Sequence, residues 1–357
     1  MTIDQTRAVG STAVRSQAGP TAAGAPWPVA AVTGAFAFVT ERPRSLYAAA
    51  VLRIGYGLLY LAVLLREFPH RDEIWGPGSP WSPALARELL ARSGWFSILT
   101  LSDRPGYFSC CYAVALLTSV LFMLGWHSRV TSVMFAVVVT SFHGRAMFMT
   151  DGGDNFIELM AVYLMFTACG RRWSLDARRL VRASARPGRD RPTPPVPGPA
   201  LRQALLVRSL LSTVVHNCGM FVIAAQVCVL YGSAGLYKVQ GDMWRDGTAL
   251  HYALNLGLFQ PWPGLSHLAD EHSLLLAVGC YLTVLIQVAF PFALFSRTKY
   301  AVLMLLLAMH LSIAVLLGLP VFSGAMATAD AVFLSDRFFL RLACRLRAAA
   351  RVPGPAV

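Results

Sequence analysis

The chain has 357 residues, of which 56% are hydrophobic and only 14% charged, and its formal net charge is +13. Soluble domains contain about 25% charged residues. Long apolar runs recur from residue 45 to residue 334, which excludes a pair of soluble domains and indicates one bilayer-embedded unit. The positive charge does not indicate a nucleic-acid partner, because most basic residues lie between or beside the apolar runs.

Residues 1–44 are predicted to form a flexible cytoplasmic tail that ends in a short interfacial helix. The apolar stretch Ala30–Val39 is short and is followed by Glu41 and Arg42. This pattern does not fit a cleaved signal peptide.

The apolar runs predict about eight transmembrane helices. A helix rises 1.5 Å per residue, so about 20 apolar residues cross a hydrocarbon core near 30 Å thick. A helix-breaking turn at Gly318–Pro320 separates the last two runs, and a count of seven stays open. The predicted spans are Ser45–Leu65, Tyr107–Trp126, Val130–Met149, Asn155–Cys169, Leu210–Tyr231, Ser273–Phe295, Tyr300–Leu319 and Val321–Leu334.

The basic residues predict the orientation of these spans. With the N-terminus inside, most of the 31 Lys and Arg residues lie on the cytoplasmic side, as the positive-inside rule requires. An even number of spans also places the basic tail 336–357 there. We therefore expect an all-α helical bundle over residues 45–335 in the plasma membrane, with both termini cytoplasmic. The loop 171–208 is predicted to be a cytoplasmic linker, disordered where proline is frequent at 186–199.

Two segments on the predicted outer side are longer than simple turns. Arg66–Gly106 contains a candidate short helix at Ser82–Ala91, and Val239–His272 contains amphipathic stretches. Both carry tryptophans, which favour the headgroup level of a membrane. They are predicted to form a lid over the outer face.

Ionisable side chains within spans are costly and by default indicate function or a structural pair. Arg53 lies in the first span, where a buried ion pair with Glu158 or Asp330 is favoured over catalysis. The neighbouring Gly55 and Gly57 would let another helix approach closely. The candidates are Arg53, His143, Arg145, Glu158, His216, Lys238, His310 and Asp330.

A polar cluster is predicted at the outer end of the third span. Asp151 and Asp154 follow His143 and Arg145 closely in the chain. The aspartates could face the histidine or the arginine as a carboxylate pair at the outer mouth. Equally, they could form a polar turn in which an aspartate caps the next helix.

Two further positions each have two readings. Lys238 could be a lysine that extends its ammonium group to the interface, or a partly buried general base. Small residues at Gly232, Ser233 and Gly235 would provide the close packing that a buried site needs. His310 could be a hydrogen-bonded packing residue or a proton relay, with Asp330 as its partner or that of Arg53.

The seven cysteines form no CxxC motif, and His216 stands apart from the other histidines. No phosphate loop, HExxH motif or nucleophile elbow is present. Neither a disulfide framework nor a metal site is therefore expected.

Three stretches together resemble a known family. They are Leu52–Gly57 with the run to Pro77, Ala234–Lys238 with the segment to Leu254, and Met309–Leu311 with Leu319–Ser323. In their order and spacing, and with Asp151–Asp154 as in bacterial members, they resemble the HTTM (horizontally transferred transmembrane) domain. This is the membrane domain that vitamin K-dependent γ-carboxylases share with many bacterial proteins. The likeness covers roughly residues 45–335.

The resemblance implies a lyase-like or oxidoreductase activity that uses a reduced, vitamin K-like quinone with O2 and CO2. Lys238 would be the base that deprotonates the hydroquinone, and His310 would lie at the quinone site. His143 is a weaker candidate for a second catalytic histidine. Tyr237, Trp244 and Arg53 would contribute to cofactor binding.

Alternative functions stay open. The animal carboxylase has a large extracytoplasmic domain that is not seen before Val357, and the length resembles that of bacterial members. One such group, similar to sporulation-delaying protein B, matures a secreted peptide toxin. A non-redox maturation or export factor for a secreted peptide is therefore the alternative to the enzyme, and a transporter or structural membrane protein is the third reading. Membrane lipid and a secreted peptide are the expected partners.

Overall fold

The computed structural model describes residues 27–185 and 198–349, and over these ranges the fold is all-α, as predicted. It contains sixteen α-helices and four short 3-10 helices, with no strand in the described residues. The 3-10 helices are Ile98–Thr100, Met147–Met149, Gly257–Phe259 and Ala331–Phe333.

Five helices are long and apolar enough to cross a membrane. Their length and composition are those of the spanning helices of an integral membrane protein. These helices are α2 (Leu46–Arg66), α5 (Pro105–Leu124), α9 (Pro199–Gln240), α13 (Ser273–Ala293) and α14 (Lys299–Leu316).

The other three predicted spans are helices that are shorter or less apolar than these five. They are α6 (Ser128–Arg145), α7 (Gly152–Met165) and α15 (Pro320–Asp330). At 1.5 Å per residue, the 14 residues of α7 are about 21 Å long, less than a hydrocarbon core near 30 Å. The count of eight spans therefore stays a prediction.

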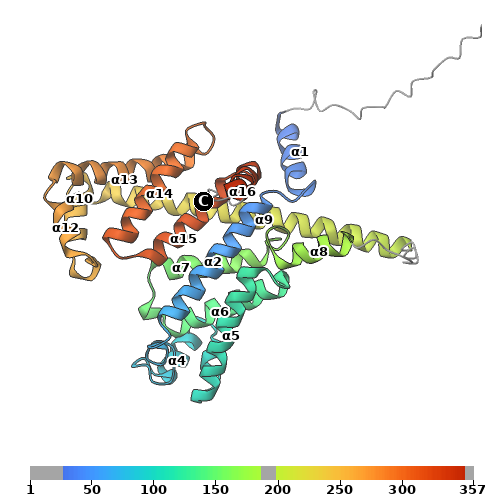
Figure 1. The fold of residues 1–357 in the computed structure, drawn as a ribbon, viewed down its shortest axis with the longest axis horizontal. Coiled ribbons are helices and arrows are strands. Elements are labelled where there is room, and N and C mark those ends of the chain that lie inside the picture. The colour runs from blue at the N-terminus through green and yellow to red at the C-terminus, as the bar shows by residue number, and fades with distance from the viewer. Residues whose placement is uncertain (1–26, 186–197, 350–357) are drawn as a thin grey trace, which may run out of the picture.

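The helices pack as two groups that meet along α2 and α15 (Figure 1). In the first group α2 packs on α5, and α6 packs on α7. In the second group α9 packs on α13, and α14 packs on α15. Small residues allow these contacts, as predicted: a methyl group on Gly57 would lie 3.0 Å from the main chain of α5 at Met123.

The predicted outer side carries short helices. The first outer segment holds α3 (Arg71–Ile74) and α4 (Pro83–Ser93), and the second holds α10 (Asp242–Arg245), α11 (Ala249–Leu254) and α12 (Pro263–Asp270). Figure 1 shows α4 and α12 well apart, each over its own helix group. A lid formed by the two outer segments together stays a prediction.

The predicted cytoplasmic side also carries helices. They are α1 (Trp27–Thr40), α8 (Leu175–Ala185) and α16 (Asp336–Ala349). The predicted linker 171–208 is helical at both flanks, in α8 and in the first turns of α9, because its apolar and basic residues alternate with helical spacing there. Most of its proline-rich run, residues 186–197, lies outside the described residues, as do 1–26 and 350–357 of the predicted tails.

An aspartate from α8 caps the start of α6. Asp176 accepts hydrogen bonds from the main-chain nitrogens of His127, at 2.9 Å, and Ser128, at 2.7 Å, and from the Ser128 hydroxyl at 2.7 Å. The first nitrogens of a helix have no partner within it, so a carboxylate there is stabilising. Partial burial alone would raise the pKa of Asp176, but these hydrogen bonds outweigh it and lower the pKa below its ordinary value.

Candidate functional site

The position of Lys238 follows from the packing of α9 against α13. Gly235 lies one helical turn before Lys238, and a methyl group there would lie 2.7 Å from Val288 Cγ2 and 3.0 Å from the Val288 main-chain nitrogen. Because glycine has no side chain, α13 approaches α9 closely enough for Gln287 to reach the lysine. This confirms the predicted role of Gly235, whereas Gly232 meets only ordinary contacts.

The ammonium group of Lys238 is held by uncharged partners. Its Nζ atom donates to Gln287 Oε1 at 3.0 Å and to the Ala234 carbonyl oxygen at 3.4 Å. It also lies 5.2 Å from the centre of the Trp244 ring, within cation–π range. The ion pairs of the described residues do not include Lys238. The side chain is therefore fixed and half-buried rather than extended freely into water.

His310 belongs to a buried chain of polar side chains. Its Nε2 atom lies 2.9 Å from the hydroxyl of Tyr231, and that hydroxyl donates to Asp330 Oδ2 at 3.1 Å. His310 is 2% exposed, Tyr231 1% and Asp330 8%. The predicted partnership of His310 with Asp330 is thus made through a tyrosine that joins α9, α14 and the end of α15.

In the described part of the chain, two polar atoms of the His310–Tyr231–Asp330 group are left without a hydrogen-bond partner. Tyr231 has one hydroxyl proton, so when it donates to Asp330 it must accept from a protonated Nε2 of His310. In that arrangement His310 Nδ1 is an acceptor, and neither it nor Asp330 Oδ1 has a hydrogen-bond partner among the described residues. Buried polar atoms of native proteins are usually paired, and unpaired ones need an explanation.

Gln287 connects the lysine to the helix that carries His310. Its amide nitrogen lies 3.6 Å from the sulfur of Met309, the residue before His310. Lys238 is thus linked to α14 where α9, α13 and α14 pack together. Trp244 lies there too, whereas the side chain of Tyr237 is 76% exposed and points away from this packing.

Arg53 lies elsewhere, and its predicted ion pair is not formed. Its guanidinium group is fully buried and donates to the carbonyl oxygens of Phe122, at 2.7 Å, Trp173, at 2.7 Å, and Cys169, at 3.2 Å, and to that of Met123. Two of these carbonyls, of Phe122 and Met123, belong to the final turn of α5, where helix carbonyls run out of helical partners, and that of Phe122 also accepts from the Gly125 main-chain nitrogen at 3.0 Å. Arg53 thus caps a helix end at the predicted cytoplasmic side and is remote from the lysine.

His216 has a similar structural role. Its Nδ1 atom accepts from the Ala168 main-chain nitrogen at 3.0 Å, so its Nε2 atom carries the proton and donates to the Arg44 carbonyl oxygen at 2.7 Å. The imidazole joins the segment before α2 to the segment after α7. Both nitrogens are used, which leaves none for a ligand.

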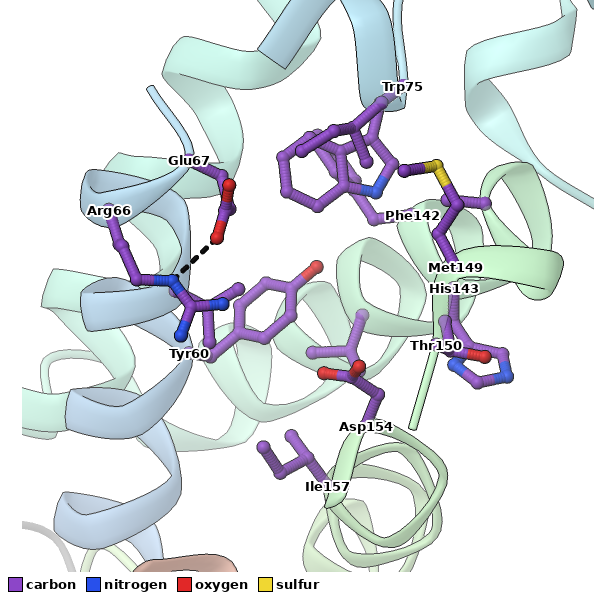
Figure 2. A pocket seen from close by; sticks show the side chains of 14 residues that line it. Tyr60, Arg66, Glu67, Trp75, Phe142, His143, Met149, Thr150, Asp154 and Ile157 are labelled. Atoms are coloured by element: carbon purple, nitrogen blue, oxygen red, sulfur yellow. Dashed lines mark hydrogen bonds and ion pairs between the residues drawn. The ribbon is translucent and has the colours of Figure 1, made fainter. Parts of the chain in front are cut away.

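His143 lines a separate cavity of about 220 Å³ at the predicted outer end of α2, α6 and α7 (Figure 2). Its Nε2 atom lies 3.4 Å from Glu158 Oε2, and both side chains are largely buried. The predicted carboxylate–histidine pair exists, but the carboxylate is Glu158 of α7. Neither Lys238 nor His310 lines this cavity, so the three predicted catalytic residues do not form one site.

The predicted helix cap at Asp151 is confirmed. Its side chain accepts from the main-chain nitrogens of Gly153, at 2.6 Å, and Asp154, at 3.0 Å, while Asp154 Oδ2 accepts from the Asp151 nitrogen at 3.1 Å. This reciprocal capping box starts α7. Arg145 does not face these aspartates: it is 1% exposed and donates to the Gly76 carbonyl oxygen at 2.9 Å.

Sequence reasoning missed three polar residues that the structure places at these sites. Tyr231 lies two helical turns before Lys238 on α9, a spacing that puts both on one face. Gln287 is an amide inside an apolar run, and a search extended from ionisable to all polar side chains would have found it. Tyr60 could not have been singled out, because only the cavity shows that its hydroxyl faces a free space.

No metal site emerges from the part of the chain that the structure describes, where no three His, Cys, Asp or Glu side chains gather closely enough to hold an ion.

Comparisons with known proteins give one relative. The "Uncharacterized protein YitO" of Bacillus subtilis (strain 168) is 27% identical to this chain over 214 residues, which are 58% of this chain and 60% of that protein. The chain thus spans less than two thirds of the relative's length. No protein-family model and no solved structure matches.

Proposed function

We propose that this membrane protein carries out quinone-dependent proton abstraction at its outer face, with Lys238 as the base, in support of oxygenation or carboxylation of a peptide or small molecule. The observation that carries the proposal is the setting of Lys238. Its Nζ atom is fixed by Gln287, Ala234 and Trp244, all of them uncharged. A lysine meant only as an interfacial anchor needs no such constraint.

The residues around Lys238 fit the phenolic end of a reduced quinone. The Trp244 ring offers a flat aromatic surface and Gln287 an amide that can orient a hydroxyl. The side chains of Leu236 and Tyr237, exposed on the same turn of α9 but directed away from the contact with α13, would meet an apolar tail arriving from the lipid. The reduced quinone would supply the reducing equivalents, and O2 would be the oxidant.

The chain's own residues would handle the proton. In its neutral form Lys238 Nζ accepts the proton of a substrate hydroxyl and becomes an ammonium group, which Gln287 and the Trp244 ring then stabilise. The buried His310–Tyr231–Asp330 chain meets α9 at Tyr231, two helical turns before Lys238, and has acceptor capacity left on His310 Nδ1. It is the route we assign for removing that proton from the lysine.

The test is oxidation of a reduced naphthoquinone by the purified protein in lipid nanodiscs, followed as oxygen uptake and product formation. The sequence contains only two lysines, Lys238 and Lys299, and Lys299 also lies over an aromatic ring, 5.0 Å from the centre of Tyr300. Lys299→Ala is therefore a matched control. We expect turnover by the wild type and by Lys299→Ala, and at least a hundredfold loss in Lys238→Ala.

Two outcomes would reject the proposal. One is no turnover by folded wild-type protein across several reduced quinones, which would favour a non-redox maturation or export factor for a secreted peptide. The other is equal turnover in wild type and Lys238→Ala, which would leave the lysine as an interfacial anchor.

A further inference from the structure

The cavity at the outer end of α2, α6 and α7 carries features of a binding site that the proposed function does not use. It lies between Tyr60 and Arg66 of α2, Glu67 directly after α2, Trp75 after α3, Phe142 and His143 of α6, and Asp154 of α7. Its volume of about 220 Å³ corresponds to roughly seven waters at ~30 Å³ each. This space suits a small organic group.

A buried hydroxyl without a partner points into the cavity. Tyr60 is 7% exposed, and its hydroxyl has no hydrogen-bond partner among the described residues. Figure 2 shows the ring of Tyr60 directed into the cavity, with the Asp154 carboxylate facing the same space. An orphaned hydroxyl costs free energy in the empty protein, and a ligand that bonds to it would recover that cost.

The charges of the cavity leave one carboxylate uncompensated. Arg66 Nε lies 2.5 Å from Glu67 Oε1, so these two charges neutralise each other. Glu158, which does not line the cavity, has His143 Nε2 as its neighbour at 3.4 Å. Asp154 accepts only a main-chain hydrogen bond, from Asp151, and takes part in none of the ion pairs of the described residues. A cation is the ligand that would complete the balance.

The apolar part of the wall also favours a cation. Trp75 and Phe142 contact each other edge to face, with ring centres 5.5 Å apart, and with Tyr60 they present three aromatic rings to the cavity. Aromatic rings attract organic cations through their negative faces. The acceptors at Asp154 and Tyr60 add a demand for N–H donors, which a primary ammonium group meets and a quaternary one does not.

We propose that this cavity binds a primary ammonium group on a short chain, with the Asp154 carboxylate and the Tyr60 hydroxyl as acceptors and Trp75 and Phe142 around the cation. Two sources share this chemistry: a free amine and the ethanolamine headgroup of a lipid. The site is separate from Lys238, so this inference does not rest on the proposed function.

The first test measures binding of 2-phenylethylamine to the purified protein in phosphatidylcholine nanodiscs by titration calorimetry, with neutral 2-phenylethanol as the ligand control. We expect the amine to bind at least tenfold more tightly than the alcohol. Asp154→Asn, which keeps an oxygen for the Asp151 nitrogen, should weaken amine binding at least tenfold. Asp103→Asn, which removes an exposed carboxylate paired with Arg87, should leave binding unchanged.

Tyr60→Phe separates binding from folding. Because the hydroxyl has no partner, its removal should leave the thermal stability of the empty protein unchanged or raised, yet weaken amine binding several-fold. Lys238→Ala should bind the amine like the wild type.

If the lipid is the natural source, phosphatidylethanolamine nanodiscs will weaken the apparent amine affinity by competition, whereas a free-amine site will show equal affinity in both lipids. Equal binding of amine and alcohol, or unchanged binding in both Asp154→Asn and Tyr60→Phe, would overturn the proposal.

Discussion

Gly235 of α9 and Val288 of α13 pack so closely that no side chain fits between them, since an added methyl group would lie 2.7 Å from Val288 Cγ2. The contact involves the main chain of α13 as well, at 3.0 Å, so a rotamer change cannot relieve it. The reach of Gln287 to Lys238 depends on this approach.

Gly235→Ala should therefore destabilise the protein and separate Gln287 from Lys238. Inserting a methyl group into a well-packed contact typically costs ~1–3 kcal/mol. Gly232→Ala is the matched control on the same helix, because a methyl group there would lie 3.7 Å from Pro291, an ordinary contact. Thermal unfolding in detergent should show a lower Tm for the first variant only. Equal Tm values for the two variants would contradict the packing described.

Arg53→Met should be among the most damaging single substitutions in the chain. It removes the guanidinium donors from the carbonyl oxygens of Phe122 and Met123 in the last turn of α5 and of Cys169 and Trp173 between α7 and α8, and of these four only the Phe122 oxygen keeps a main-chain donor among the described residues, from Gly125. Each unsatisfied buried acceptor costs about 1–3 kcal/mol, so we expect little folded protein to be recovered.

The control for this substitution is Arg92→Met on the exposed surface of α4. Arg92 pairs with Glu88 one turn away, and both side chains are mostly exposed. Such pairs contribute about 0.5 kcal/mol or less. Size-exclusion chromatography of both variants tests the difference, and equal recovery would mean that Arg53 is not essential for folding.

Asp176→Asn should show a pH-dependent defect. The hydrogen bonds from Ser128 and His127 hold the pKa of Asp176 below its ordinary value despite partial burial. A lowered folded-state pKa stabilises the protein above the unfolded pKa, near 4, and this contribution is lost as the pH falls through the folded pKa. The variant should thus be less stable than the wild type at pH 7, by up to ~1 kcal/mol as for other helix caps.

Unfolding curves between pH 3 and pH 7 check this prediction. The difference between variant and wild type should shrink below about pH 4, because the wild-type carboxylate is then being protonated. A difference that stays constant over this range would show that the charge of Asp176 contributes nothing and that only its oxygen atoms matter.

The two lysines test the predicted orientation. Lys238 ends α9 on the predicted outer side, and Lys299 begins α14 on the predicted cytoplasmic side. A membrane-impermeant amine reagent applied to intact cells should label Lys238 and spare Lys299, whereas both should react in opened membranes. Mass spectrometry of the peptides distinguishes these cases. Preferential labelling of Lys299 in intact cells would invert the topology.

The all-α fold and most helix positions follow directly from the apolar runs, because the length and composition of a spanning helix are constrained by the bilayer. The helix cap at Asp151 was also readable, since it depends on residues three positions apart. Contacts between distant segments could not be predicted. Arg53 was expected to pair with a carboxylate, but it binds main-chain carbonyl oxygens. Because every residue has such an oxygen, the sequence does not indicate which ones an arginine will bind.

The candidate site shows the same limit. Single residues such as Lys238 and His310 stand out in an apolar run, whereas their partners Gln287 and Tyr231 are identified only by which helix faces pack together. His143 illustrates the opposite case, because the family resemblance made it a weaker candidate for the Lys238 site but its helix lies in the other packing group.

The capping role of Arg53 also bears on the order in which the chain is completed in the membrane. α2 enters the bilayer first, but the carbonyl partners of Arg53 come from Phe122, Cys169 and Trp173. A ribosome must therefore add about 120 residues beyond Arg53 before the guanidinium is fully satisfied. Until then its long side chain can reach the headgroups at the nearby end of α2. The setting of Arg53 in the first predicted span is thus complete only when the second and fourth predicted spans and the segment to Trp173, which supply these carbonyls, are in place.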